Sequence, residues 1–436
     1  MGNAGALALS MVLIGWAASM RAMSGTWLQP SAFFPLWWCC AGILPLIFAP
    51  QEPVGSNAMV WLIAASIAVS IGAFAGNWGF RTKRVITPTQ ATDRELRLFG
   101  VALSVALLLG LASNLTFILG SSIPLGDILD IEKLVVVSNK LYIQRYAESG
   151  PPPPPPLSQA LLPFVYLAPA VGGILFVLRR EMRWKVFALL SYLPAIAVTI
   201  LQTTKAAVLF SMVLWLSGYF ATRLRFGKLA VFTKAHLITA SAVVGVVTIF
   251  FFAVSLARMA STDFSLLGVV VDKLLIAAFG HMTVFSQWLG EYWQEPASPS
   301  LGKVTFAGPL ELLGYTQRVP GLFESVVNLI MGDTSNIYTG FRPLIQDFTI
   351  PGALAILSVL GFIGGIGFRL VAQGKWSAVP LLLIAYVTIL WTPITWFWIY
   401  NSLTATVFAV ALMVFVVRLW RGAPYRREPG KRFATS

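Results

Sequence analysis

The stretch from Asp333 to Phe348, DTSNIYTGFRPLIQDF, concentrates polar side chains in a chain that is 57% hydrophobic and only 11% charged. If the stretch is helical, Tyr338, Arg342 and Gln346 lie on one face, because side chains four residues apart share a side of a helix. An Arg guanidinium suits bidentate contacts with phosphate or carboxylate groups. This face is therefore a candidate binding site.

The remaining polar residues of the stretch have expected positions too. Asn336 and Thr339 lie where such a helix would begin, and Asp347 follows Arg342 by five residues, within reach of an ion pair in some geometries. Alternatively, the whole stretch is a polar collar that orients the apolar run after it.

A further candidate is Lys205, in the short sequence TTKAA between two apolar runs. It can hold a phosphate group at the membrane surface. It can equally extend its ammonium group from the edge of the bilayer into water, as lysines near the ends of spans commonly do.

The elements that carry these residues are expected to cross a membrane. A mean hydropathy of +0.78 over 436 residues is too apolar for a water-soluble chain. Each span needs about 20 apolar residues. Eleven runs qualify, at 3–20, 32–49, 57–79, 98–120, 158–178, 186–203, 206–222, 237–257, 351–370, 377–399 and 402–418.

The loops between these runs alternate in charge. One set holds 22 of the 31 Lys and Arg residues with four acidic residues, and the other set holds the remaining nine cations with 13 acidic residues. Positively charged loops stay in the cytoplasm, so the C-terminus is expected inside and the N-terminus outside. The net charge of +14 is then a topology signal, which favours a membrane protein over a nucleic-acid-binding one.

Two outer loops are long enough to carry function. The first has a segment around 134–142 that is expected to lie on the membrane surface, followed by a polyproline spacer at 151–156. The second is too long for a structureless connection and is expected to fold as a cap, with helical pieces at 264–289 and 321–331. The predicted organisation is spans one to four (1–120), the first long loop (121–157), spans five to eight (158–257), the large catalytic loop (258–350), spans nine to eleven (351–418) and a basic cytoplasmic tail (419–436).

The segment SNIYTGFRPLIQDFTIPG resembles the end of the large outer loop in the Wzy-type oligosaccharide repeat-unit polymerases of bacterial polysaccharide export. That family has a stretch of the type N-x-Y-T-x-x-R-x-x-x-x-D-F-x-x-x-G before a late span. The matching residues here are Asn336, Tyr338, Thr339, Arg342, Asp347, Phe348 and Gly352. TTKAA resembles a basic turn of the family, with Lys205 where arginine is more usual.

The resemblance implies an all-α polytopic membrane protein of about eleven spans, similar to GT-C glycosyltransferases, with an active site on the periplasmic side of the inner membrane. It implies a glycosyltransferase that moves a growing glycan from undecaprenyl pyrophosphate onto a new lipid-linked repeat unit. Membrane lipids, a chain-length regulator and a flippase are the implied partners.

The residues suit that reaction, because cations near the headgroups can neutralise a departing lipid pyrophosphate. Arg342 and Lys205 are the expected pyrophosphate ligands with Arg145 as a third, and Arg258 and Arg318 are further candidates. The acceptor hydroxyl must also lose a proton, and His281 is one candidate base, with Glu291, Asp333 and Asp347 as alternatives. Asp347 can instead orient Arg342. The residues expected to contact substrate are Asn336, Tyr338 and Thr339.

No cofactor and no metal are expected. The first outer turn carries one acid, Glu52, and the next loop has Asp127 and Asp130 three residues apart, which is weak support for a metal site. Fixed cations are expected to take the electrostatic role of a metal ion.

Three other functions remain open from the sequence: a ligase, a flippase or other transporter, and a non-catalytic scaffold of the export machinery. An O-antigen ligase would move a finished glycan to lipid A core, but the residues after His281 match the ligase histidine motif poorly. A lipid-linked oligosaccharide flippase would carry its polar groups near the middle of the membrane. Loss of a polymerase leaves single repeats on the core, whereas loss of a ligase leaves bare core.

Overall fold

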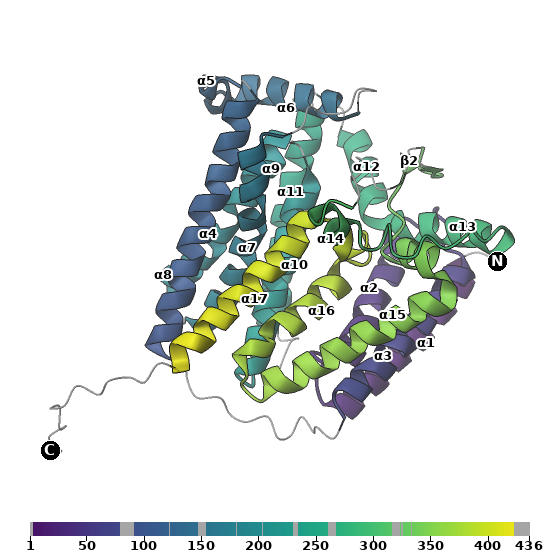
Figure 1. The fold of residues 1–436 in the computed structure, drawn as a ribbon. Helices are drawn as coiled ribbons and strands as arrows, with labels where there is room; N and C mark the ends of the chain where they lie inside the picture. Colours follow the sequence, from purple (N-terminus) through teal and green to yellow (C-terminus); the bar gives the residue numbers. More distant parts are fainter. Residues whose placement is uncertain are drawn as a thin grey trace, which may run out of the picture.

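The computed structural model shows a chain built almost entirely of helices (Figure 1). It describes residues 3–78, 91–121, 123–146, 154–179, 181–202, 204–229, 234–259, 267–315, 323, 326–332 and 334–422.

Of the described helices, nine are long and apolar enough to cross a bilayer. They are α1 (Asn3–Ser24), α2 (Pro30–Phe48), α3 (Ser56–Gly76), α4 (Asp93–Gly120), α7 (Pro156–Leu178), the run Met182–Gln202 formed by α8 (Met182–Leu189), η2 (Leu190–Tyr192) and α9 (Leu193–Gln202), α10 (Lys205–Arg225), α15 (Phe341–Ala372) and α17 (Asn401–Gly422). The chain is therefore a multi-pass helical membrane protein, and nine of the eleven expected spans are confirmed as spanning-length helices.

The other two expected spans fall on α11 and α16. The run 237–257 lies within α11 (Lys234–Arg258), which has 25 residues. The run 377–399 contains the shorter α16 (Val379–Trp391), preceded by η4 (Trp376–Ala378) and followed by η5 (Phe397–Ile399). The fully described apolar parts cover 241–257 and 376–391, so the count of eleven stays a prediction.

Helices α3 and α15 pack backbone against backbone through glycines spaced four residues apart. A Cβ added at Gly72 would lie 1.8 Å from the Ser358 carbonyl oxygen, and one added at Gly361 would lie 2.1 Å from the Val69 carbonyl oxygen. Small residues at such spacing let membrane helices approach closely. This contact joins the N-terminal helices to the part of α15 after Thr349, where a φ of 62° breaks the helix and separates this part from the short helix that carries Arg342.

Replacing Gly361 by alanine is expected to destabilise the protein by about 1–3 kcal/mol, because the new methyl group overlaps backbone atoms that cannot move aside. The measurement is the midpoint of thermal unfolding in detergent. Gly15→Ala is the matched control, since nothing lies within 4 Å of a Cβ at Gly15. A Gly361→Ala midpoint equal to that of the control would contradict the close packing.

Several helix ends that carry the basic loops are joined to one another. Arg369 Nη1 donates to the Trp78 carbonyl oxygen at 3.4 Å, which connects the ends of α15 and α3. The Thr26 hydroxyl donates to the Leu229 carbonyl oxygen at 3.4 Å, which connects the turns after α1 and α10. We call this side of the bundle the basic end.

The opposite side holds the two long loops, and we call it the long-loop end. Met331 N donates to Glu52 Oε1 at 2.8 Å, and Gly55 N donates to the Ser286 hydroxyl at 3.0 Å, so the α2–α3 turn is tied to the second long loop. Figure 1 shows α5 (Leu125–Leu129) and α6 (Ile131–Tyr146) lying across the top of the helices on this side. The alternation that the charges predicted is therefore present in the fold.

The second long loop is folded, as expected, but one of its pieces is not a helix. It contains α12 (Leu267–Phe279) and α13 (His281–Gln294), bent by 54° at Gly280, then α14 (Ala307–Leu312). The prediction of a helix over 321–331 is wrong for the described residues 326–331, because β1 (Val327–Asn328) pairs antiparallel with β2 (Thr334–Ser335). Adjacent valines favour a strand, and Gly332 has a φ of +85° that suits a turn.

The first half of the polyproline spacer at 151–156, residues 151–153, lies outside the described residues. Pro154 and Pro155 precede α7, which begins at Pro156. Proline is favoured in the first turn of a helix, because its missing N–H would have no partner there.

Candidate functional site

The helix that carries Arg342 starts later than the sequence suggested. It begins at Phe341, with Gly340 as its N-cap, so Asn336, Tyr338 and Thr339 precede it. The Gly340 N–H donates to the Thr392 carbonyl oxygen at 2.6 Å. This tight contact stops the helix from extending further toward its N-terminus.

Thr339 has a structural position. It is fully buried, with a φ of 64° that is uncommon for a residue with a branched side chain. Its hydroxyl accepts a hydrogen bond from Phe341 N at 3.3 Å. Thr339 therefore shapes the chain into α15, and its side chain is directed to the backbone.

Arg342 lies among aromatic rings. Its Cζ is 3.9 Å from the ring centroids of both Phe323 and Tyr338, and 5.4 Å from that of Trp288. A cation over an aromatic face is stabilised by about 2 kcal/mol or more when water is excluded. The rings therefore hold the guanidinium in place, and Tyr338 acts on Arg342 although it is outside the helix.

A cavity of about 460 Å³ opens beside Arg342. Its size falls within the range of about 300–1,000 Å³ that is typical of small-molecule sites. The residues that matter for its chemistry are Trp288, Glu291, Tyr292, Glu295, Arg342 and Gln346. With Gln294 as a second amide, one cation, two carboxylates, two amides and two aromatic side chains therefore line one space.

The expected shared face of Arg342 and Gln346 is present, because both line this cavity one helical turn apart. The facing residues come from α13 and its C-cap: Trp288, Glu291 and Tyr292 lie in the helix, Glu295 follows it, and the four recur at spacings of three and four. Residues so spaced share a helix face. The spacing of these residues in QWLGEYWQE already indicates this face in the sequence.

The carboxylate of Asp347 belongs to a different contact. It is fully buried and accepts hydrogen bonds from Val304 N at 3.1 Å, from Thr305 N at 2.6 Å and from the Ser300 hydroxyl. Asp347 lies five positions after Arg342 on the helix and points to the turn before α14. The structure therefore favours a role for Asp347 in fastening this turn over that of a base or of a partner for Arg342.

Asp347→Asn is expected to destabilise the protein, by about 1–3 kcal/mol for each buried donor that loses its acceptor. The thermal unfolding midpoint in detergent should fall, and activity per folded molecule should remain. Asp272→Asn is the control, because Asp272 is exposed on α12. A variant with an unchanged midpoint and no activity would show that Asp347 acts in the chemistry.

His281 is also placed away from the cavity. Its side chain is 5% exposed, at the start of α13, and its Nδ1 lies 3.1 Å from the Ala278 carbonyl oxygen. A buried imidazole held against a backbone carbonyl cannot reach a substrate hydroxyl in this arrangement. The expectation that His281 is the proton acceptor is therefore not supported by its position.

Asn336 and Lys205 lie outside the set of described residues that line the cavity. Asn336 is exposed after β2, and its Nδ2 donates to the Phe323 carbonyl oxygen at 3.4 Å. Lys205 is half-buried at the first position of α10.

The starts of α10 and α15 contact one segment at the end of α16. Phe210 stacks on Trp391 with ring centroids 3.5 Å apart, and Gly340 donates to Thr392. Lys205 and Arg342 therefore occupy the same end of the bundle, with residues 391–392 between their helices.

Four other predicted site residues fall wholly or partly outside the described residues. Arg145 and Arg258 lie near the ends of α6 and α11, and their side chains fall outside the described part of the chain. Arg318 and Asp333 lie outside the described residues altogether.

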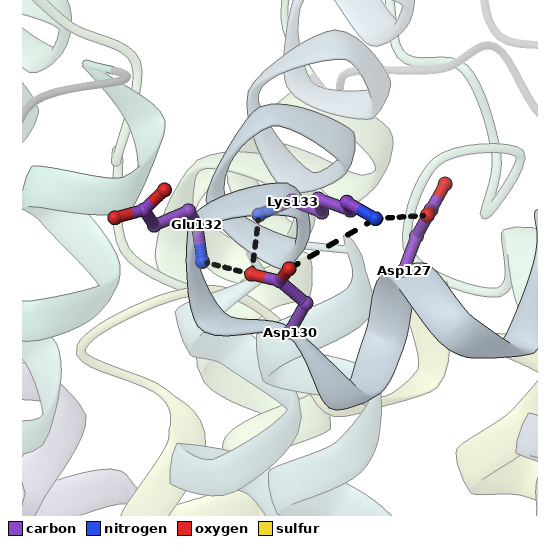
Figure 2. A network of polar contacts seen from close by, with 4 residues as sticks. All are labelled: Asp127, Asp130, Glu132 and Lys133. Carbon is purple, nitrogen blue, oxygen red and sulfur yellow. Dashed lines mark hydrogen bonds and ion pairs between the residues drawn. The ribbon is translucent and has the colours of Figure 1, made fainter.

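The acidic pair of the first long loop is occupied by a lysine (Figure 2). Lys133 Nζ is 3.7 Å from Asp127 and 3.9 Å from Asp130, and Asp130 accepts from the backbone N–H groups of Glu132 and Lys133. Asp130 thus caps the start of α6. Within the described ranges, no group of three or more His, Cys, Asp or Glu side chains is arranged to hold a metal ion.

Comparison of the chain with protein-family models, curated proteins and solved structures finds no match. The interpretation of the cavity therefore depends on its residues and on their geometry.

Proposed function

We propose that the chain is a glycosyltransferase that polymerises undecaprenyl-pyrophosphate-linked repeat units at the outer face of the bacterial inner membrane. The growing glycan leaves its lipid pyrophosphate and joins the non-reducing end of a new lipid-linked unit. The observation that carries the proposal is the position of Arg342, held by aromatic rings beside a polar cavity at the long-loop end of a multi-pass bundle.

The guanidinium suits the leaving group of this reaction. Breaking the bond between the anomeric carbon and the pyrophosphate places additional negative charge on a phosphate oxygen. A cation already fixed nearby stabilises that charge without having to reorganise, and the rings around Arg342 supply such fixation. Lys205, at the same end of the bundle, is proposed as a second contact for the lipid pyrophosphate.

The rest of the cavity suits a sugar. The ring faces of Trp288 and Tyr292 can pack against the C–H groups of a pyranose. Carboxylates accept hydrogen bonds from hydroxyl groups, and the Gln346 amide can both donate and accept them. A cavity of this composition supports the binding of a neutral, hydroxyl-rich ligand beside the cation.

The proposal is tested with the full-length chain purified in detergent and with lipid-linked repeat units extracted from cells that lack the chain. The expected product is a ladder of longer lipid-linked glycans, resolved by gel electrophoresis and mass spectrometry. A ligase would form product only when lipid A core is supplied, and a flippase would form no new glycosidic bond. Absence of a ladder although the protein is folded would reject polymerisation.

A further inference from the structure

The proposed reaction needs a group that accepts the proton of the acceptor hydroxyl, and this inference rests on that proposed function. His281 is buried against the Ala278 carbonyl oxygen. Asp347 is fully buried, and its carboxylate already accepts three hydrogen bonds from the 300–305 turn. Neither lines the cavity beside Arg342.

Glu291 has the position that the other two lack. It is exposed on α13 and lines the same cavity as Arg342. Trp288, one helical turn before it, lies 5.4 Å from the Arg342 guanidinium carbon and 5.4 Å from the Tyr292 ring, centroid to centroid. A carboxylate and a cation therefore flank one aromatic surface.

We propose that Glu291 is the general base that activates the acceptor sugar hydroxyl in this cavity. The hydroxyl oxygen forms a bond to the anomeric carbon of the donor, and its proton passes to the Glu291 carboxylate. The bond from the anomeric carbon to the phosphate oxygen breaks, and its electron pair leaves with the lipid pyrophosphate beside Arg342. No oxidant or further reactant is needed.

The arrangement also selects between the two glutamates. Glu291 lies within α13, three residues after Trp288, and therefore on the same helix face as the ring that contacts Arg342. Glu295 is the C-cap residue just outside α13, where the backbone angles are no longer helical. Of the two carboxylates, Glu291 is therefore the one that the helix holds in place.

The test compares variants of the full-length chain on lipid-linked repeat units extracted from cells that lack the chain. Glu291→Gln is expected to lower the rate of glycan extension by about 10²–10⁴-fold, the usual contribution of a general base. Binding of the lipid-linked unit, measured by crosslinking it to the protein, should be retained. Glu295→Gln should lose much less activity. Asp272→Asn, an exposed acid outside the cavity, should stay close to the original rate.

The pH profile separates a base from a structural residue. Extension by the original chain should fall at acidic pH, because a carboxylate can accept a proton only when it is deprotonated. That fall should be absent from the residual activity of Glu291→Gln.

Each outcome decides the matter. Extension by Glu291→Gln within threefold of the original rate would overturn the assignment and leave polymerisation intact. An equal loss in Glu295→Gln would also overturn it, in favour of a shared electrostatic role. If Glu291→Gln does not fold, Glu291→Ala decides, and extension by that variant within threefold of the original rate rejects the base. Failure of the original chain to extend the substrate would overturn the proposed function and the base together.

Discussion

Replacing Arg342 by alanine is expected to lower the rate of glycan extension by about 10²–10³-fold, the usual effect of removing one fixed group that stabilises transition-state charge. The reason is its position, with Cζ 3.9 Å from two ring centroids at the edge of the cavity. Cells that carry the variant should make little or no polymer while protein level and membrane insertion are unchanged.

Arg342→Lys refines the result. Lysine keeps the charge but loses the planar pair of donors that binds two phosphate oxygens together. Its activity is therefore expected to fall between those of the original chain and Arg342→Ala. Lys303→Ala is the matched control, because Lys303 is an exposed cation of the same loop.

Arg342 also joins the segment before α15 to α13, so stability must be measured alongside activity. The thermal unfolding midpoint of Arg342→Ala shows whether activity is lost because the charge is gone or because the segment before α15 is displaced. Polymer of original length in cells that carry Arg342→Ala would remove Arg342 from the mechanism. A loss of activity that merely follows the amount of folded protein would do the same.

Arg225→Met is expected to destabilise the protein by about 3–5 kcal/mol, the cost of leaving one member of a buried ion pair unpaired. Arg225 Nη2 lies 3.8 Å from Glu95 Oε1, and both side chains are 3% exposed. Trp376 Nε1 donates to the same Glu95 oxygen at 2.5 Å, and the Arg225 guanidinium lies 4.3 Å from the Trp376 ring. The cluster joins α4, α10 and η4 at the basic end.

A double variant shows whether the loss of stability comes from the unpaired Glu95 charge or from the loss of the Arg225 side chain itself. Adding Glu95→Gln to Arg225→Met removes the uncompensated charge, so the double variant should unfold at a higher temperature than Arg225→Met alone. Arg183→Met is the control, because Arg183 forms an exposed pair with Glu181 at 2.6 Å and such pairs are worth about 0–1 kcal/mol. Equal unfolding midpoints for Arg225→Met and Arg183→Met would show that the buried ion pair contributes no more to stability than the exposed one.

The spans were predictable because a bilayer imposes one length on any helix that crosses it. Nine expected runs became helices of that length. The alternation of ends was predictable for a similar reason, since charge in the loops follows the side of the membrane. Both properties are local in the chain, and no knowledge of packing is needed to read them.

The roles of individual polar residues were less predictable. Asp347 and Arg342 share a motif, yet one binds the 300–305 turn and the other faces the cavity. The 321–331 segment reads as helical by its apolar residues, but a strand pairs there with Thr334 and Ser335. Position in sequence does not specify which neighbour a side chain will contact.

The sequence by itself determined that the chain crosses a membrane many times, which ends carry the positive loops, and that Arg342 and Gln346 share a face. Only the tertiary structure decided that α13 brings Trp288 and Glu291 to that face and that His281 is buried in the same helix. The physical reason is that apolar length and charge act on each segment separately against lipid and water. A binding cavity, in contrast, exists only where segments about fifty residues apart are packed together.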